Sequence, residues 1–151
     1  EVIYNANMLL KTGQKIEYPQ EIDEISVLFD EKTLELVLSN LVHNAIKYSP
    51  EDSIINITVD QENNNLFINV IDRGIGISSK EQSYIFDRYF RAENALLTQG
   101  TGIGLNICKQ HLENLGASLN FLSKENDGSI FTVRIPQEHK KIIANEKNFI
   151  N

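Results

Sequence analysis

The sequence predicts a two-layer α/β sandwich, with a mixed, mostly antiparallel sheet and about three helices on one face. Two pairs of alternating, branched-residue segments support this prediction, at residues 55–60 with 66–72 and at 118–123 with 129–135. Segments with helical spacing of apolar residues separate these pairs. Because each hairpin must bury one face, the intervening helices are expected to cover the same side of one sheet.

The first thirty residues predict one helix and two short strands. Apolar residues at helical spacing in residues 1–12 predict a helix, and Gly13 is expected to follow it at the C′ position. Residues 15–18 predict a strand that Pro19 stops, and residues 26–29 predict a second strand.

A long helix follows. Asp30 is expected to cap it and Pro50 to mark its end. Its apolar residues recur at intervals of three and four, which is the strongest helix signal in the chain: Leu34, Val37, Leu38, Leu41, Val42, Ala45 and Ile46.

The remaining elements surround the two hairpins, whose turns are QENNN and KENDG. Ser78 and Glu81 match a capping box and predict a short helix towards Phe86. Residues 92–101 have no period and predict a mobile loop. A second amphipathic helix is expected from Ile103 to Leu115, where Gly116 follows.

Length and composition limit the class of protein. The 151 residues suit one domain, which we place at residues 1–136, with a polar and loosely attached tail at 137–151. The net charge is -7 without a basic run, which argues against nucleic-acid binding. No apolar stretch is long enough to cross a bilayer, and Cys108 is the single cysteine. We expect a cytoplasmic domain, whether or not a full-length protein is anchored in a membrane.

Two glycine-rich turns indicate a ligand. Gly100, Gly102 and Gly104 precede a helix, where bare backbone and free N–H groups favour an anion such as phosphate. The spacing fits neither a dinucleotide fingerprint nor a Walker loop, and a flexible loop before a helix would look the same. Asp72 ends a buried strand before another such turn. It is either an ordinary turn residue or a buried carboxylate that accepts from an adenine amine.

The long helix supplies a polar flank beside its apolar stripe. Asn40, Asn44 and Lys47 fall together at helical spacing, and Tyr48 lies between them and the stripe. Asparagine is a mediocre helix former, so two at this spacing suggest a role. One interpretation is an amide oxygen that holds Mg²⁺ on phosphate, with Lys47 adding positive charge. The other is a solvated flank.

Four segments in order resemble the N, G1, F and G2 boxes of bacterial sensor histidine kinases. They are NLVHNAIKYSP at 40–50, DRGIGI at 72–77, IFDRYFR at 85–91 and GTGIGL at 100–105. The resemblance covers roughly residues 1–136. It implies the Bergerat, or GHKL, ATP-binding fold shared with gyrase, Hsp90 and MutL, with ATP and Mg²⁺ as cofactors.

The resemblance also implies site residues. Asn44 is the expected Mg²⁺ ligand, and Asn40 and Lys47 face the phosphates. Tyr48 borders the nucleotide, and Asp72 takes the adenine amine. The other implied nucleotide contacts are turn, lid and hinge residues, with Arg88 at the γ-phosphate: Gly74, Gly76, Phe86, Arg88, Phe90, Arg91, Gly100, Thr101, Gly102, Gly104 and Leu105. Phe86 and Phe90 also suit ordinary core packing, and a solvated helix end suits Arg91 better than Arg88.

The resemblance favours a kinase over a hydrolase. Hydrolysing branches of this fold carry a glutamate four residues before the metal asparagine, and here that position is Asn40, which cannot take a proton from water. Catalysis is therefore assigned to positioning by Asn40, Lys47 and Arg88. The family's acceptor histidine lies in a preceding dimerisation domain. Because His43, His111 and His139 lie in no such motif, we expect that the chain binds ATP without autophosphorylating.

The expected partners are ATP, the dimerisation and histidine-phosphoacceptor domain of the same kinase and, indirectly, a response regulator receiver domain. The domain itself is expected to be monomeric. An anti-sigma-type serine kinase and a non-catalytic ATP-sensing module remain alternatives, whereas a purely structural domain does not explain the four boxes. We also expect residues 93–99 to form a lid that docks on the acceptor domain when ATP binds.

Overall fold

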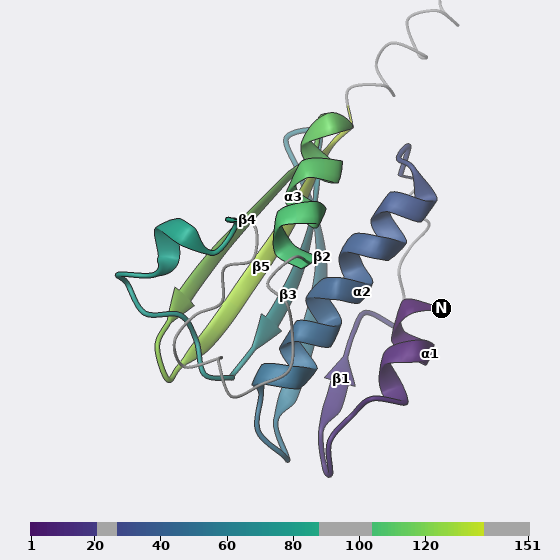
Figure 1. Ribbon diagram of the computed structural model, residues 1–151. Coiled ribbons are helices and arrows are strands. Elements are labelled where there is room, and N and C mark those ends of the chain that lie inside the picture. Colours follow the sequence, from purple (N-terminus) through teal and green to yellow (C-terminus); the bar gives the residue numbers. More distant parts are fainter. Residues whose placement is uncertain (21–26, 88–103, 138–151) are drawn as a thin grey trace, which may run out of the picture.

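The computed structural model describes residues 1–20, 27–87 and 104–137. Its described strands form one five-stranded sheet in the order β1-β2-β3-β5-β4. Strands β1 and β2 are parallel, and the other described pairs are antiparallel. Helices α2 and α3 lie side by side over one face of this sheet, and α1 lies beside β1 (Figure 1). The predicted two-layer α/β fold is therefore confirmed.

Most helices and strands occur in the predicted order along the chain. The helices are α1 (Val2–Asn7), α2 (Glu31–Tyr48) and α3 (Gly104–Asn114), with a 3₁₀ turn, η1, at Gln82–Tyr84. The strands are β1 (Lys15–Glu17), β2 (Ile54–Glu62), β3 (Asn65–Asp72), β4 (Ser118–Lys124) and β5 (Gly128–Pro136).

The core lies between α2, α3 and the inner face of the sheet. The apolar stripe of α2 contributes Val37, Leu41 and Val42, each at most 2% exposed. Alternate residues of β3 and β5 are buried in the same core, as the period of two in a half-buried strand requires. This packing fixes the height and rotation of α2 above the end of β3.

Local capping explains where two helices begin and end. The Asp30 carboxylate accepts from the Thr33 backbone N–H at 2.9 Å and so caps α2 as predicted. Helix α3 ends before Gly116, where the Ala117 N–H reaches back to the Leu112 carbonyl at 2.8 Å.

Three element predictions are wrong. Helix α1 ends at Asn7 with Met8 as its C-cap, so Gly13 belongs to a later turn rather than to the helix end. Residues 27–29, the described part of the expected second strand, form no strand. The capping box leads only to η1, because Ser78 bonds the Glu81 carboxylate and caps no helix N–H group.

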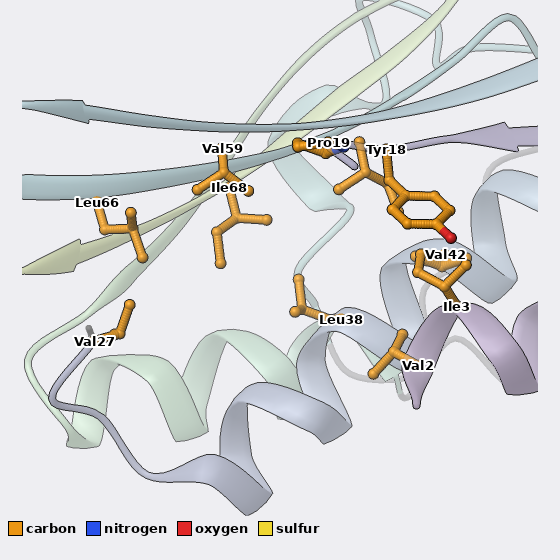
Figure 2. A pocket seen from close by; sticks show the side chains of 11 residues that line it. Val2, Ile3, Tyr18, Pro19, Val27, Leu38, Val42, Val59, Leu66 and Ile68 are labelled. Carbon is orange, nitrogen blue, oxygen red and sulfur yellow. The ribbon is translucent and has the colours of Figure 1, made fainter. Parts of the chain in front are cut away.

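An apolar cavity of about 270 Å³ lies between α1, α2 and the sheet, beside β1 and β2. Of its eleven lining side chains only Tyr18 carries a polar group, so it lacks the donors and acceptors that a nucleotide needs (Figure 2). The polar flank of α2 is a separate surface. Within the described ranges, no helix combines the length and apolarity needed to cross a bilayer.

Candidate nucleotide site

Asp72 is the last residue of β3, and its side chain is half-buried. Its Oδ1 accepts from the Gly74 backbone N–H at 2.9 Å. Burial raises the pKa of the Asp72 carboxyl, and the backbone N–H groups of Gly74 and Ser129 act in the opposite direction. No ion pair to Asp72 is present among the described residues, so a partly buried carboxylate here gains from a further donor. An exocyclic amine is such a donor.

The turn after Asp72 is held against α2 on one side. The Ile75 N–H donates to the Tyr48 carbonyl at 3.1 Å, at the last turn of α2. Gly74 lies so close to that carbonyl that an added Cβ would collide with it. A glycine is therefore required here by contact, and the turn after Asp72 is attached to the helix that carries Asn40, Asn44 and Lys47.

The β4–β5 hairpin holds the other side of the same turn. The Ile75 carbonyl accepts from the Asn126 N–H at 2.7 Å, and the Ile77 N–H donates to Ser123 Oγ at 2.9 Å. Gly76 has φ +65 and faces the Lys124 carbonyl, where an added Cβ would not fit. The turn is thus fixed between two elements before any ligand arrives.

The polar flank of α2 carries Asn40, Asn44 and Lys47. Asn40 Nδ2 donates to the Leu36 carbonyl at 2.9 Å, and its Oδ1 lies beside Gly104, whose added Cβ would be 2.8 Å away. The Asn44 side chain is half-buried and has no hydrogen-bond partner among the described residues. Its amide oxygen is therefore available to a hard cation, which fits the expected Mg²⁺.

Lys47 and Tyr48 occupy the last turn of α2. Lys47 Nζ lies 5.4 Å from the centroid of the Tyr48 ring. From Asn40 to Tyr48 the helix rises about 12 Å. The helix therefore contacts the start of α3 at Asn40 and the turn after Asp72 at Tyr48, two places about 12 Å apart along its axis.

Phe86 is packed between α3 and β4. Its ring meets Phe121 edge-on at 5.6 Å, and Lys109 Nζ lies 4.7 Å from its centroid. Its carbonyl accepts from Asn106 Nδ2 at 2.8 Å. These contacts match the core-packing interpretation and also fix where the segment after residue 87 begins.

Several predicted site residues lie outside the described residues: Arg88, Phe90, Arg91, Gly100, Thr101 and Gly102. The expected loop at 92–101, the expected lid at 93–99 and the tail from residue 138 also lie outside them. Of the glycine-rich segment, Gly104 opens α3 and Leu105 packs on the core.

Sequence reasoning missed the residues that support the site from behind. Ser123 Oγ accepts from Ile77 N–H, bonds Ser129 Oγ at 2.7 Å and donates to the Gly128 carbonyl. Gln82 Nε2 donates to the carbonyls of Ile77 and Ser123. The hairpin register pairs Ser123 with Ser129. Two polar residues on an otherwise apolar inner face were the available signal.

Comparison with known proteins agrees with this geometry. The family model for the histidine kinase-, DNA gyrase B-, and HSP90-like ATPases matches residues 29–139. The chain belongs to this family. It is the ATP-binding catalytic domain of the sensor histidine kinase type, so the resemblance seen in the four boxes is confirmed, as is ATP binding.

Individual relatives show the same class. The sensor-like histidine kinase SenX3 of Mycolicibacterium smegmatis is 42% identical over 113 residues, which cover 74% of this chain and 29% of SenX3. The sensor protein KdpD of Clostridium acetobutylicum is 36% identical over 126 residues, covering 82% of this chain and 14% of KdpD. The chain therefore spans less than a third of these curated relatives.

Among solved structures, the nucleotide-free catalytic domain of the histidine kinase ThkA is similar to this chain. Its TM-score is 0.71 at 27% identity, with 90% of both chains covered. A domain of the same extent is thus found in that kinase.

Proposed function

We propose that this domain binds ATP with Mg²⁺ and donates the γ-phosphoryl group to a histidine in a dimerisation domain outside this chain. The observation that carries the proposal is Asn40, four residues before the proposed metal ligand Asn44. Its Nδ2 donates to the Leu36 carbonyl, its Oδ1 lies beside Gly104 at the start of α3, and an amide has no basicity. The site is therefore suited to hold ATP rather than to activate water.

At the base end, Asp72 accepts the adenine amine. Its Oδ1 already receives the Gly74 N–H and the Ser129 N–H also acts on the carboxyl, so the adenine amine would donate to an acceptor position that these two groups leave open. Guanine would present a carbonyl to the same carboxylate and be repelled. This arrangement supports selection of adenine over guanine.

At the phosphate end, Asn44 would hold Mg²⁺, which neutralises charge on the phosphates when bound. Lys47 adds positive charge from the same face of α2, and Gly104 leaves room beside Asn40. Arg88, Arg91 and residues 100–102 are proposed to complete this end, on the basis of their place in the boxes.

The transfer is a substitution at the γ-phosphorus. A histidine nitrogen of the acceptor forms the new N–P bond, and the bond from phosphorus to the β,γ-bridging oxygen breaks. The bond electrons leave with ADP, and the imidazolium loses one proton to solvent. In-line positioning supplies most of the rate.

The test is a trans-phosphorylation assay with γ-labelled ATP and the helical-hairpin acceptor domain of the same kinase. We expect label on the acceptor that is lost in acid, as phosphohistidine is, and none on this chain. Acid-stable label on a serine substrate would favour the anti-sigma-type kinase. Wild-type ATP binding without transfer to any acceptor would favour the sensing module.

Arg88→Ala adds a control within the chain. A transferring enzyme should lose rate and keep most of its ATP affinity, because the arginine is proposed to act at the γ-phosphate. A sensing module has no rate to lose.

A further inference from the structure

Two side chains far from α2 in sequence cap its C-terminal end. Lys11 Nζ donates to the carbonyls of Lys47 at 2.9 Å and Ser49 at 2.6 Å. Gln14 Nε2 faces the carbonyls of Ile46 at 3.2 Å, Ser49 at 3.2 Å and Pro50 at 3.0 Å. Lys11 and Gln14 are here called the α2 end cap.

The helix needs this cap because its own sequence supplies none. The last carbonyls of a helix lack intrahelical partners. Helix α2 ends without a left-handed glycine: its C-cap Ser49 is extended, at φ -99 and ψ 149, and Pro50 has no N–H. A lysine ammonium at this end also meets the negative end of the helix dipole favourably.

The cap is built into a rigid turn. Gln14 is 5% exposed, and its Oε1 accepts from the Lys11 N–H at 2.8 Å. The Thr12 carbonyl accepts from the Asp52 N–H at 3.0 Å, and Gly13, at φ +75, lies where an added Cβ would collide with Asp52. The turn at residues 11–14 is therefore locked to the chain that follows α2.

The same turn of α2 borders the nucleotide site. Its Tyr48 carbonyl receives the Ile75 N–H, which ties it to the turn after Asp72. The carbonyls of residues 46–50 are thus held by the end cap on one side and by the Asp72 turn on the other. A shift at Lys11 would move Lys47 and Tyr48 relative to Asp72.

We propose that Lys11 and Gln14 are positioning residues for nucleotide binding, which set the last turn of α2 against the Asp72 turn. The inference rests on the proposed roles of Asp72, Lys47 and Tyr48. The matched family region begins at residue 29, so it does not include either cap residue.

The test uses Lys11→Met, which keeps the apolar stem and removes the donor, and Lys11→Arg, which restores a cationic donor. ATP titration should show about fivefold weaker binding for Lys11→Met, or ~1 kcal/mol, and near wild-type binding for Lys11→Arg. The Ile75 amide should also exchange faster with solvent in Lys11→Met. Gln14→Glu, which keeps the acceptor for Lys11 N–H and removes the donors, should weaken binding in the same direction.

A stability control separates positioning from general destabilisation. Ile135→Val removes one methylene from a buried site on β5, at the end of the sheet away from Asp72, and should cost about 0.5–1.5 kcal/mol of stability without changing ATP affinity. The inference, but not the proposed function, would be overturned if Lys11→Met bound ATP as tightly as wild type. It would also be overturned if Ile135→Val lost as much ATP affinity as Lys11→Met. A wild-type chain that binds no ATP would instead overturn the proposed function as well.

Discussion

Replacing Asp72 with asparagine should weaken ATP binding and stabilise the fold at the same time. In the wild-type chain the Gly74 nitrogen lies 2.9 Å from Asp72 Oδ1. The substitution keeps an oxygen for this N–H group and replaces the other oxygen with an NH₂ group. That group cannot accept from the adenine amine. The shape of the site is preserved, so the two effects have separate physical causes.

The loss of affinity follows from one hydrogen bond to a charged acceptor, worth about 1.5–3 kcal/mol. This corresponds to an increase in Kd of about 10- to 100-fold. The gain in stability follows from burial, which raises the pKa of the Asp72 carboxyl and so makes its charge costly at neutral pH.

The pH dependence gives the sign of the stability effect. An acid whose pKa is raised by folding disfavours the fold above that pKa and has no effect below its ordinary value of 3.8. Asp72→Asn should therefore be more stable than wild type at pH 7, and the difference should shrink as the pH falls towards 3.8. Denaturant unfolding across this range measures it.

Calorimetric titration with ATP and GTP completes the assay. Asp127→Asn is the matched control, because it removes the same charge from an exposed residue of the β4–β5 turn and should leave affinity unchanged. If Asp72→Asn binds ATP as wild type does and keeps the same preference over GTP, the base-end assignment is refuted.

Three further changes test separate parts of the structure. Gly116→Ala should lower stability by the ~1–2 kcal/mol that a non-glycine residue costs in a left-handed conformation, because Gly116 has φ +79 and open space around it. Gly76→Ala should lower stability by more than this, because its Cβ would also meet the Lys124 carbonyl. Denaturant midpoints compare the two variants. Asp30→Ala should lower the melting temperature at pH 7, because hydrogen bonds from Thr33 lower the pKa of the Asp30 carboxyl and so stabilise the fold. The difference in melting temperature from wild type should fade below pH 3.8. Asn40→Glu should raise ATP hydrolysis measured by phosphate release, whereas Asn40→Gln, which adds no base, should not.

The parts of the fold that the sequence predicted best are those set by local periodicity. The three-four repeat of α2 placed its bounds and its polar flank, and alternation placed both hairpins. The short N-terminal elements were predicted worse. Helix α1 has six residues, too short to be specified by its own pattern, and its end depends on packing rather than on Gly13.

The residues of the candidate site also differ in how far the sequence could predict them. The residues expected to contact the ligand, such as Asn44 and Asp72, came from motifs whose chemistry recurs, and their roles stay predictions. Ser123 and Gln82 could not, since each acts through a backbone group more than forty residues away or across a turn. Only the register of the β4–β5 hairpin brings Ser123 to the Ile77 N–H.

The hydrogen bonds around residues 74–77 indicate why a half-buried carboxylate can be kept here with no ion pair to a cation among the described residues. Tyr48, Ser123 and Asn126 hold the backbone of the turn from two sides, so the Gly74 N–H stays directed at Asp72 whether or not adenine is present. A preorganised donor lowers the cost of the charge on the carboxylate. On the proposed role of Asp72, adenine would gain an acceptor without reorganising the turn, and affinity would then depend on the residues that fix the turn as well as on Asp72.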